Sequence, residues 1–198
     1  MNMLANLKRS EIFKVKKLGK VATFQYGYTA TANQQGEFRF IRITDIDEQG
    51  NISDKNKKYV DLPNKNQKKY LLKQEDLIVA RTGSVGKTAL FESNEKAVFA
   101  SYLIRIKLNS TILPKYYWIF SQTQQYWNQV NSLTKGTIQS QFNANVLKDI
   151  LVPIPSLENQ KKIIAFWNKK NEMIINFQIL TKFFQEKKQK LLNNFWNF

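Results

Sequence analysis

Apolar and polar residues alternate most clearly between residues 37 and 46, where the chain reads EFRFIRITDI. This spacing predicts a β-strand, because residues two apart share one face of a strand. We expect Phe38 and Phe40 to face a core, and Arg39 and Arg42 to be available on the outside. The segment therefore predicts a central strand flanked by two surface cations.

The next part of the chain is also β-rich and contains a glycine-rich turn. DLIVA (76–80) is a short apolar run, and residues 89–108 are rich in Val, Ile, Phe and Tyr, which favour strands. Between them lies RTGSVGK, which has two glycines. The pattern predicts strand, turn and strand, with Arg81 and Lys87 on either side of the turn.

Helical and loop segments follow and separate these strands. Residues 112–133 (ILPKYYWIFSQTQQYWNQVNSL) predict one helix, with Pro114 in its first turn and core-facing aromatic residues on one side. The lysine-rich residues 53–74 predict a long surface loop or short strands. DILVPIP (149–155) predicts a strand that two prolines end.

The composition changes beyond Pro155, where no further glycine or proline occurs. Residues 156–198 predict a single helix with Ser156 as its N-cap, and at 1.5 Å per residue this helix would be about 60 Å long. Large apolar residues recur along it at the heptad-like spacing of paired helices. They are Ile163, Trp167, Ile174, Phe177, Phe184, Leu191 and Phe195.

This apolar stripe is too long for a single globular domain to cover, and an exposed stripe of that size would promote aggregation. No second long helix is predicted in the chain, so we expect the partner to come from another molecule, as an antiparallel coiled coil with a second copy. The predicted fold class is α/β (α+β). A mixed globular domain (1–155) is followed by one long dimerisation helix (156–198).

The chain is strongly basic. Its 198 residues include 31 Lys and Arg against 15 Asp and Glu, which gives a formal charge of +16 and a pI near 9.9. Such an excess indicates a polyanionic partner, with nucleic acid favoured over an anionic membrane; a generally lysine-rich composition is the alternative. No apolar run approaches a membrane span and no signal peptide pattern begins the chain, so we expect a soluble, cytoplasmic protein.

Cysteine and histidine are both absent. Their absence excludes disulfides and thiolate metal sites, and it removes the commonest metal ligand. It also excludes catalysis by an imidazole base, including Ser-His-Asp triads. We therefore expect no metal site and no cofactor.

The stretch ARTGSVGKT (80–88) is similar in part to a nucleotide-binding P-loop. That motif needs a glycine five residues before the glycine of its Gly-Lys-Thr, and a helix after it. Counting back from Gly86 leads to Arg81, and the residues after Thr88 predict a strand. We therefore expect no ATP site. Exposed N–H groups and two cations would suit a nucleic acid phosphate equally well.

The segment GTIQSQFNANVLKDILVPIPSLENQKKIIAF (136–166) resembles the junction between target-recognition domain and conserved helix in the specificity (S) subunits of type I restriction-modification systems. Three earlier segments, KLGKVATFQYG, FRFIRITDI and DLIVARTGSVGKTALF, are similar to other parts of that domain, so the resemblance spans nearly the whole chain. The junction residues that match are Gly136, Thr137, Gln139, Leu147, Ile150, Val152, Pro153, Ile154, Pro155, Leu157, Glu158, Gln160 and Ile163.

The resemblance implies a non-catalytic subunit that supplies DNA sequence specificity to a complex with methyltransferase (M) subunits and, for cleavage, a restriction (R) subunit. A typical S subunit holds two recognition domains and two helices, whereas this chain has one of each and is similar to a half-subunit. We expect a symmetric homodimer on double-stranded DNA. Its target would be bipartite and nearly palindromic, with a spacer set by the helices.

Two classes of function compete with this one: an enzyme, either methyltransferase or nuclease, and a non-catalytic adaptor. A methyltransferase would need a Phe-x-Gly-x-Gly loop and an Asn/Asp-Pro-Pro-Tyr/Phe tetrapeptide, and the sequence has neither. A metal nuclease would need Pro-Asp followed by Asp/Glu-x-Lys, and the sequence has no Pro-Asp. A non-catalytic nucleic-acid-binding coiled-coil adaptor outside restriction-modification explains the charge and the helix. It does not explain the ordered series of family segments.

Reading a DNA duplex requires cations at phosphates, and amide, hydroxyl and guanidinium groups at base edges. The candidates come from the first loop, the central strand, the glycine-rich turn and the polar loop after the predicted helix. They are Tyr28, Thr29, Arg39, Arg42, Arg81, Thr82, Ser84, Lys87, Lys135, Thr137, Gln139 and Ser140.

Overall fold

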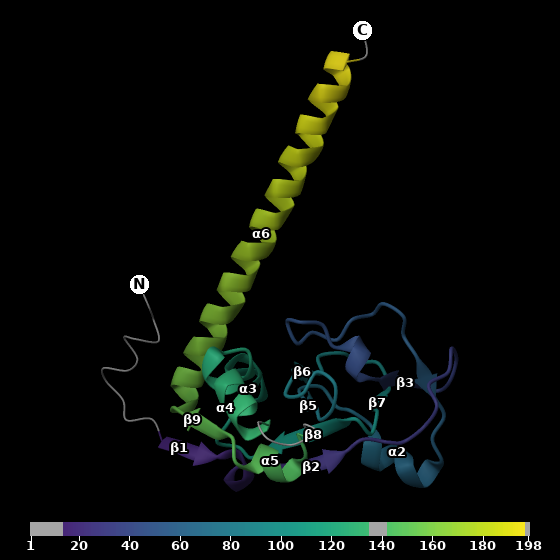
Figure 1. Cartoon of the computed structure of the whole chain (residues 1–198), viewed down its shortest axis with the longest axis vertical. Helices are drawn as coiled ribbons and strands as arrows, with labels where there is room; N and C mark the ends of the chain where they lie inside the picture. Colours follow the sequence, from purple (N-terminus) through teal and green to yellow (C-terminus); the bar gives the residue numbers. More distant parts are fainter. Residues whose placement is uncertain (1–13, 135–141, 197–198) are drawn as a thin grey trace. The chain divides into compact units, whose positions relative to one another are not determined.

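The computed structural model describes residues 14–134 and 142–196, and the chain divides into two compact units (Figure 1). Met1–Gln160 forms a mixed α/β unit, and Lys161–Phe198 holds most of one long helix. The predicted fold class is confirmed. Within the described ranges, no helix combines the length and the apolar character that a membrane crossing requires.

A four-stranded antiparallel sheet forms the centre of the first unit. Its order is β2 (Ala22–Tyr26), β8 (Leu103–Leu108), β5 (Leu77–Ala80) and β6 (Thr88–Leu90). Every residue of β5 is buried, which explains why its sequence is a continuous apolar run without alternation. The strands β5 and β6 pair across the glycine-rich turn, so the predicted strand–turn–strand is confirmed.

A second sheet has three strands, in the order β4 (Tyr59–Val60), β3 (Phe38–Ile41) and β7 (Ala97–Phe99). β3 pairs antiparallel with β4 and parallel with β7, and all of its residues are buried. The strand is central, as predicted, but neither of its faces reaches solvent. The expectation that Arg39 lies outside is therefore wrong, since its side chain is 3% exposed.

The two-stranded pair of β1 (Lys14–Lys17) and β9 (Leu151–Ile154) confirms the strand predicted before the long helix. Gln129 completes the hydrogen bonding of β9 at Leu151. Its side-chain nitrogen donates to the Leu151 carbonyl (3.0 Å), and its side-chain oxygen accepts the Leu151 N–H (2.7 Å). The strand therefore tolerates a proline at position 153, because it is not a central strand of a larger sheet.

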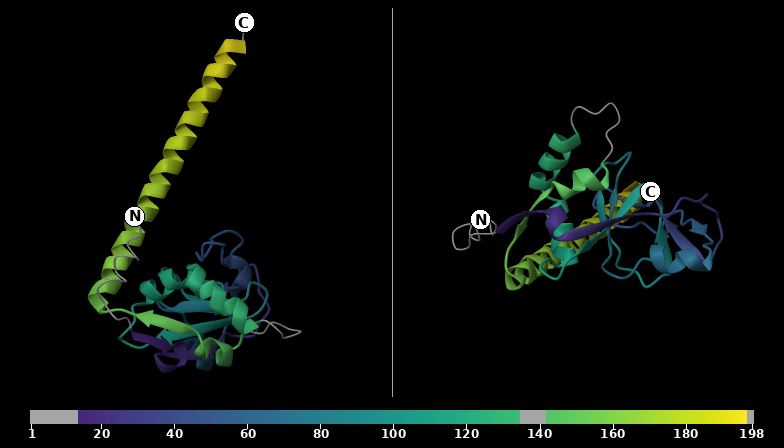
Figure 2. Two further views of the ribbon diagram at one scale, coloured as in Figure 1. Left: turned by 60° about the vertical axis from the view of Figure 1, so that its left-hand side comes forward. Right: turned by 90° about the horizontal axis from the view of Figure 1, so that it is seen from below.

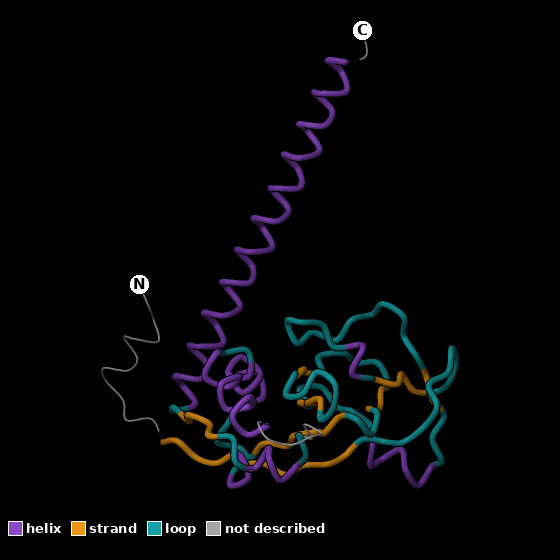
Figure 3. The backbone as a smooth tube through the Cα atoms, in the orientation of Figure 1, coloured by secondary structure: helices purple, strands orange, loops and turns teal. Residues whose placement is uncertain are grey.

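Short helices complete the described part of this unit, and Figure 3 separates them from the strands and loops. They are the 3-10 helices η1 (Leu18–Lys20) and η2 (Ile43–Asp45), and the α-helices α2 (Asn64–Tyr70), α3 (Pro114–Ser121), α4 (Gln124–Thr134) and α5 (Ala144–Lys148).

Two of these helices correct the sequence-based expectations. The single helix predicted for residues 112–133 is two helices, separated at Thr123. The Thr123 hydroxyl accepts the N–H of Tyr126 (3.3 Å) and donates to the Phe120 carbonyl (2.7 Å), so it caps one helix and bonds the end of the other. The lysine-rich residues 53–74 contain the short strand β4, as one alternative proposed, but also the unexpected helix α2.

The long helix α6 spans Leu157–Trp196. The Ser156 hydroxyl accepts the N–H of Asn159 (3.3 Å), as expected of an N-cap. The first turn belongs to the globular unit, because Gln160 is fully buried and its side-chain oxygen accepts the Leu113 N–H (2.8 Å). The compact units therefore divide after Gln160, past the boundary expected from the sequence.

The second unit exposes the seam that the heptad spacing predicted. Phe177 is 65% exposed and Phe184 is 61% exposed, and Ile174 and Leu191 are also exposed. Ile163 and Trp167 are half-buried. The side chain of the last predicted seam residue, Phe195, lies outside the described residues.

A second apolar stripe lies on the same helix and was not predicted. Ile175, Ile179 and Phe183 follow one another at four-residue intervals, and all three are exposed. At about 100° of rotation per residue, Ile175 and Ile179 face away from the seam that contains Phe177 and Phe184, whereas Phe183 borders it, with its ring centre 5.7 Å from that of Phe184. A helix with apolar residues on opposite sides is typical of one that is covered by more than one neighbour.

Candidate nucleic-acid interface

The glycine-rich turn between β5 and β6 is held firmly in place. The N–H of Gly86 donates to the Ala80 carbonyl (3.0 Å), and Tyr126 of α4 donates its hydroxyl to the Gly86 carbonyl (2.8 Å). Gly83 and Gly86 have φ values of +65° and +85°, which favour glycine. At Gly86 a Cβ would lie 2.8 Å from the Val130 side chain. These hydrogen bonds and the close packing at Gly86 make the turn rigid.

Two exposed tyrosines stand at the same end of the four-stranded sheet as this turn. Tyr26 ends β2, Tyr102 directly precedes β8, and Arg81 directly follows β5. Tyr26 pairs with Ile104 in the sheet, and the Arg81 N–H donates to the Tyr102 carbonyl (3.0 Å). Tyr102 is 60% exposed. Sequence reasoning missed both tyrosines; their positions beside strand ends were the only available signal.

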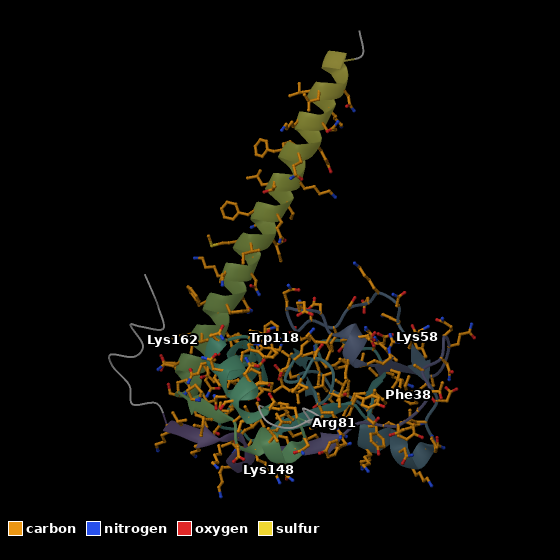
Figure 4. The ribbon with its side chains drawn as sticks, viewed as in Figure 1. Phe38, Lys58, Arg81, Trp118, Lys148 and Lys162 are labelled. Atoms are coloured by element: carbon orange, nitrogen blue, oxygen red, sulfur yellow. The ribbon has the colours of Figure 1, made fainter. Side chains whose placement is uncertain are left out.

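Arg81, which Figure 4 labels, contacts both tyrosines of this group. Its guanidinium carbon lies 4.9 Å from the centre of the Tyr26 ring, a cation–π contact. Its carbonyl accepts the N–H of Phe142 (3.1 Å), and the Tyr26 hydroxyl accepts the N–H of Ala144 (3.1 Å). The described chain therefore resumes beside Arg81, at Phe142.

Arg39 is instead a buried arginine that pairs with carboxylates nearer the surface. Its Nη1 lies 2.7 Å from Asp54 and 3.2 Å from Glu95, and Lys57 pairs with both carboxylates. Hydrogen bonding to Lys57, together with the Arg39 charge, lowers the pKa of Asp54. Hydrogen bonding to Glu95 raises the pKa of Lys57. These charges neutralise one another, so Arg39 is a structural residue.

Two other described arginines are paired with carboxylates as well. Arg42 forms a two-point contact with Asp45, with Nε–Oδ2 at 3.1 Å and Nη2–Oδ1 at 2.6 Å, which closes the 3-10 helix η2. Buried Arg105 pairs with Asp76 at 3.0 Å. Among the described residues, Arg81 is thus the arginine without a carboxylate within ion-pair distance. The expectation of Arg42 as a freely available surface cation is not met.

The P-loop lookalike has a structural role. The Lys87 ammonium lies 2.6 Å from a carboxylate oxygen of Glu48, while Thr88 is buried with its hydroxyl 3.0 Å from the Gly86 carbonyl. The strand β6 begins at Thr88, where a P-loop would begin a helix. Neither side chain is placed to bind a nucleotide phosphate. Lys87 is less available than the sequence suggested.

The other candidates fall into three groups. Tyr28 packs its ring against Tyr70 (5.1 Å between centres) and is partly buried against the core. Thr29 and Ser84 are exposed and Thr82 is half-buried, so the hydroxyls of the turn accompany Arg81. The last group lies outside the described residues: Lys135, Thr137, Gln139 and Ser140.

Exposed lysines lie on β1, η1, α5 and α2. Together with β2, these elements line one side of the unit (Figures 1 and 2). The elements are linked: Gln25 of β2 donates to the Lys69 carbonyl of α2 (2.8 Å), and Lys17 of β1 pairs with Asp149 after α5 (2.7 Å). None of the five contains an acidic residue. The lysine band consists of Lys14, Lys16, Lys17, Lys20, Lys65, Lys68, Lys69 and Lys148.

Chemically, this surface carries cations and uncharged polar groups that can bind a polyanion. Burial raises the pKa of Tyr116, Tyr117 and Tyr126, so their hydroxyls remain protonated near neutral pH. Across residues 14–134 and 142–196, no three acidic side chains gather into a set that could hold a metal ion. The surface combines a band of cations, one oriented guanidinium, and hydroxyl and phenol groups.

Comparison with known proteins gives this surface a context. Residues 9–179 match the family described as type I restriction modification DNA specificity domain. A Haemophilus influenzae protein, whose name places it among type I restriction enzyme specificity subunits, is 27% identical over 166 residues. That match covers 80% of this chain and 40% of the relative. The chain thus spans less than half of that protein.

Solved structures share the fold at low sequence identity. A chain from a type I R-M system, solved to explain complex assembly and conformational transition, matches with a TM-score of 0.67 and 15% identity, covering 96% of this chain and 48% of its own. The HsdS subunit of Thermoanaerobacter tengcongensis matches with a TM-score of 0.61 and 16% identity, and the match covers 85% of this chain and 39% of the HsdS chain. The S subunit from M. genitalium matches with a TM-score of 0.56 and 15% identity, and the match covers 86% of this chain and 43% of the M. genitalium chain. The chain belongs to the family of type I restriction modification DNA specificity domains.

Proposed function

We propose that this chain is the DNA-reading component of a type I restriction-modification system and that its globular unit binds one half-site of double-stranded DNA. The observation that carries this proposal is the Arg81 turn and its neighbouring lysine band, on a chain whose family is defined by DNA specificity. Lysines on one side supply charge for phosphates, and the rigid turn supplies groups for base edges.

The chemistry of methyl transfer and cleavage belongs to partner subunits in this proposal. The sequence lacks histidine and the methyltransferase motifs, and the described surface offers hydrogen-bonding and cationic groups. The chain would select the DNA site and hold the methyltransferase (M) subunits there. A restriction (R) subunit would join the same complex where cleavage occurs.

The long helix supplies the assembly surfaces. The seam of Ile174, Phe177, Phe184 and Leu191 would pair antiparallel with the same seam of a second copy. Twofold symmetry then presents two identical DNA-reading units, so the target would consist of two inverted half-sites with a nonspecific spacer. The second apolar stripe stays uncovered in such a pair, and we assign it to the M subunits.

The decisive experiment is methylome sequencing of a host that expresses this chain with its M subunit. The expected result is one methylated, bipartite, inverted-repeat motif that is absent from a host expressing the M subunit alone. Methylation without a motif, or a motif that does not depend on this chain, would contradict the proposal. A preference for RNA duplexes over DNA in direct binding would favour the adaptor function.

A further inference from the structure

We propose that Arg81 reads a guanine in the major groove, and that Tyr26 is the positioning residue that holds it for this contact. The inference rests on the proposed function and deepens it, because it names one base of the half-site. It concerns the only described arginine without a carboxylate partner. Arginine bound through two nitrogens to O6 and N7 of guanine is the commonest specific protein–DNA contact.

The Arg81 guanidinium has a free edge, and its central carbon lies over the Tyr26 ring. Its Nε is buried and has no hydrogen-bond partner, whereas neither terminal nitrogen is among the buried unpaired atoms. No described residue accepts a hydrogen bond from those terminal nitrogens. They remain the pair that can meet the two acceptors of guanine. The Tyr26 ring at 4.9 Å limits how the plane can tilt, which preserves the fork geometry.

The distribution of cations favours a base contact over a phosphate contact for Arg81. The lysine band already supplies many flexible point charges, which are suited to phosphates. A side chain stacked on an aromatic ring gives up that flexibility and gains direction. Its neighbours Thr82, Ser84 and Tyr102 are uncharged hydrogen-bonding groups, as base edges require.

Tyr26 is itself fixed from two directions. It pairs with Ile104 within the sheet, and its hydroxyl accepts the Ala144 N–H (3.1 Å) at the start of α5. A tyrosine held at both its backbone and its hydroxyl can orient the cation stacked on it. Removing the ring should therefore release the Arg81 guanidinium without removing its charge.

The test uses the complex of the full chain with its M subunit, on its methylated motif and on duplexes in which each G·C pair is changed to A·T in turn. Wild type should lose about ten- to hundredfold in affinity at one G·C position through the Arg81 contact. Arg81→Lys, which keeps the charge and removes the fork, should abolish that discrimination at this position only, with the salt slope unchanged.

Tyr26→Ala should reproduce the Arg81→Lys pattern, whereas Tyr26→Phe keeps the ring and should retain most of the discrimination. Lys148→Ala is the matched control for a phosphate contact. It should weaken binding to all sequences alike and reduce the salt slope by about one. Melting temperatures of each variant establish that a loss of discrimination does not come from unfolding.

The outcomes separate this inference from the proposed function. If wild type reads a motif and Arg81→Lys keeps every base preference, Arg81 is not the guanine reader and the proposed function stands. If Arg81→Ala behaves as Lys148→Ala does, Arg81 contacts a phosphate and the inference is wrong. If the wild-type complex prefers no sequence at all, both fail.

Discussion

Replacing Phe177 and Phe184 of the long helix by glutamate should convert a dimer into a monomer. Both side chains lie on the predicted seam, and they are 65% and 61% exposed in the single chain. In an antiparallel pair of identical helices, each copy contributes both phenyl rings to the interface. The double substitution therefore removes four aromatic side chains per dimer and adds four negative charges.

The size of the effect follows from the exposed area. Fully burying a large apolar side chain contributes roughly 1.5–3 kcal/mol, so a ring that is about two-thirds exposed gains roughly 1–2 kcal/mol on pairing. Four rings contribute about 4–8 kcal/mol, and since about 1.4 kcal/mol is a tenfold change, the dissociation constant should rise about a thousandfold or more. A micromolar dimer would become a millimolar one.

Sedimentation equilibrium of the pure chain at tens of micromolar measures this directly. Wild type should sediment as a dimer and the double variant as a monomer. Ile175→Glu with Ile179→Glu is the matched control, because it adds the same charge on the part of the second stripe that faces away from the seam. That control should remain dimeric and lose affinity for the M subunit. Monomeric wild type at this concentration would refute the pairing and leave the helix for a different partner.

Three further outcomes test the rest of the structure. Binding to random-sequence DNA, measured by fluorescence anisotropy, should fall about a thousandfold between about 50 and 200 mM salt, and a flat dependence would mean that the lysine band does not meet phosphates. Millimolar ATP with magnesium should leave the melting temperature unchanged, because Lys87 is paired with Glu48 and Thr88 is buried; an ATP-dependent rise would contradict that account. Arg105→Ala should destabilise the chain by about 3–5 kcal/mol and lower its melting temperature by roughly 10 °C, because Asp76 would lose its buried partner. A decrease of less than about 2 °C would refute the importance of this ion pair.

Features that depend on neighbouring residues could be predicted from the sequence. The long helix is an example, because Ser156 caps it, no glycine or proline interrupts it, and its apolar residues recur at a helical spacing. The strand–turn–strand at Arg81 is another, since apolar β-forming runs flank two glycines. The segments that resemble the DNA-specificity family are also short stretches of consecutive residues. The family could therefore be identified from the sequence, before the fold was known.

Tertiary structure alone decided which candidate cations are available. Arg39 looked like a surface residue, but β3 lies between two strands, and the chain brings Asp54 and Glu95 to it from 15 and 56 residues away. The helix α2 has no apolar periodicity; it is held by Tyr70 against Tyr28. Long-range ion pairs and packing leave no trace in local spacing. For the same reason only the folded chain distinguishes Arg81, which stacks on a tyrosine and faces no acid, from arginines that serve the core.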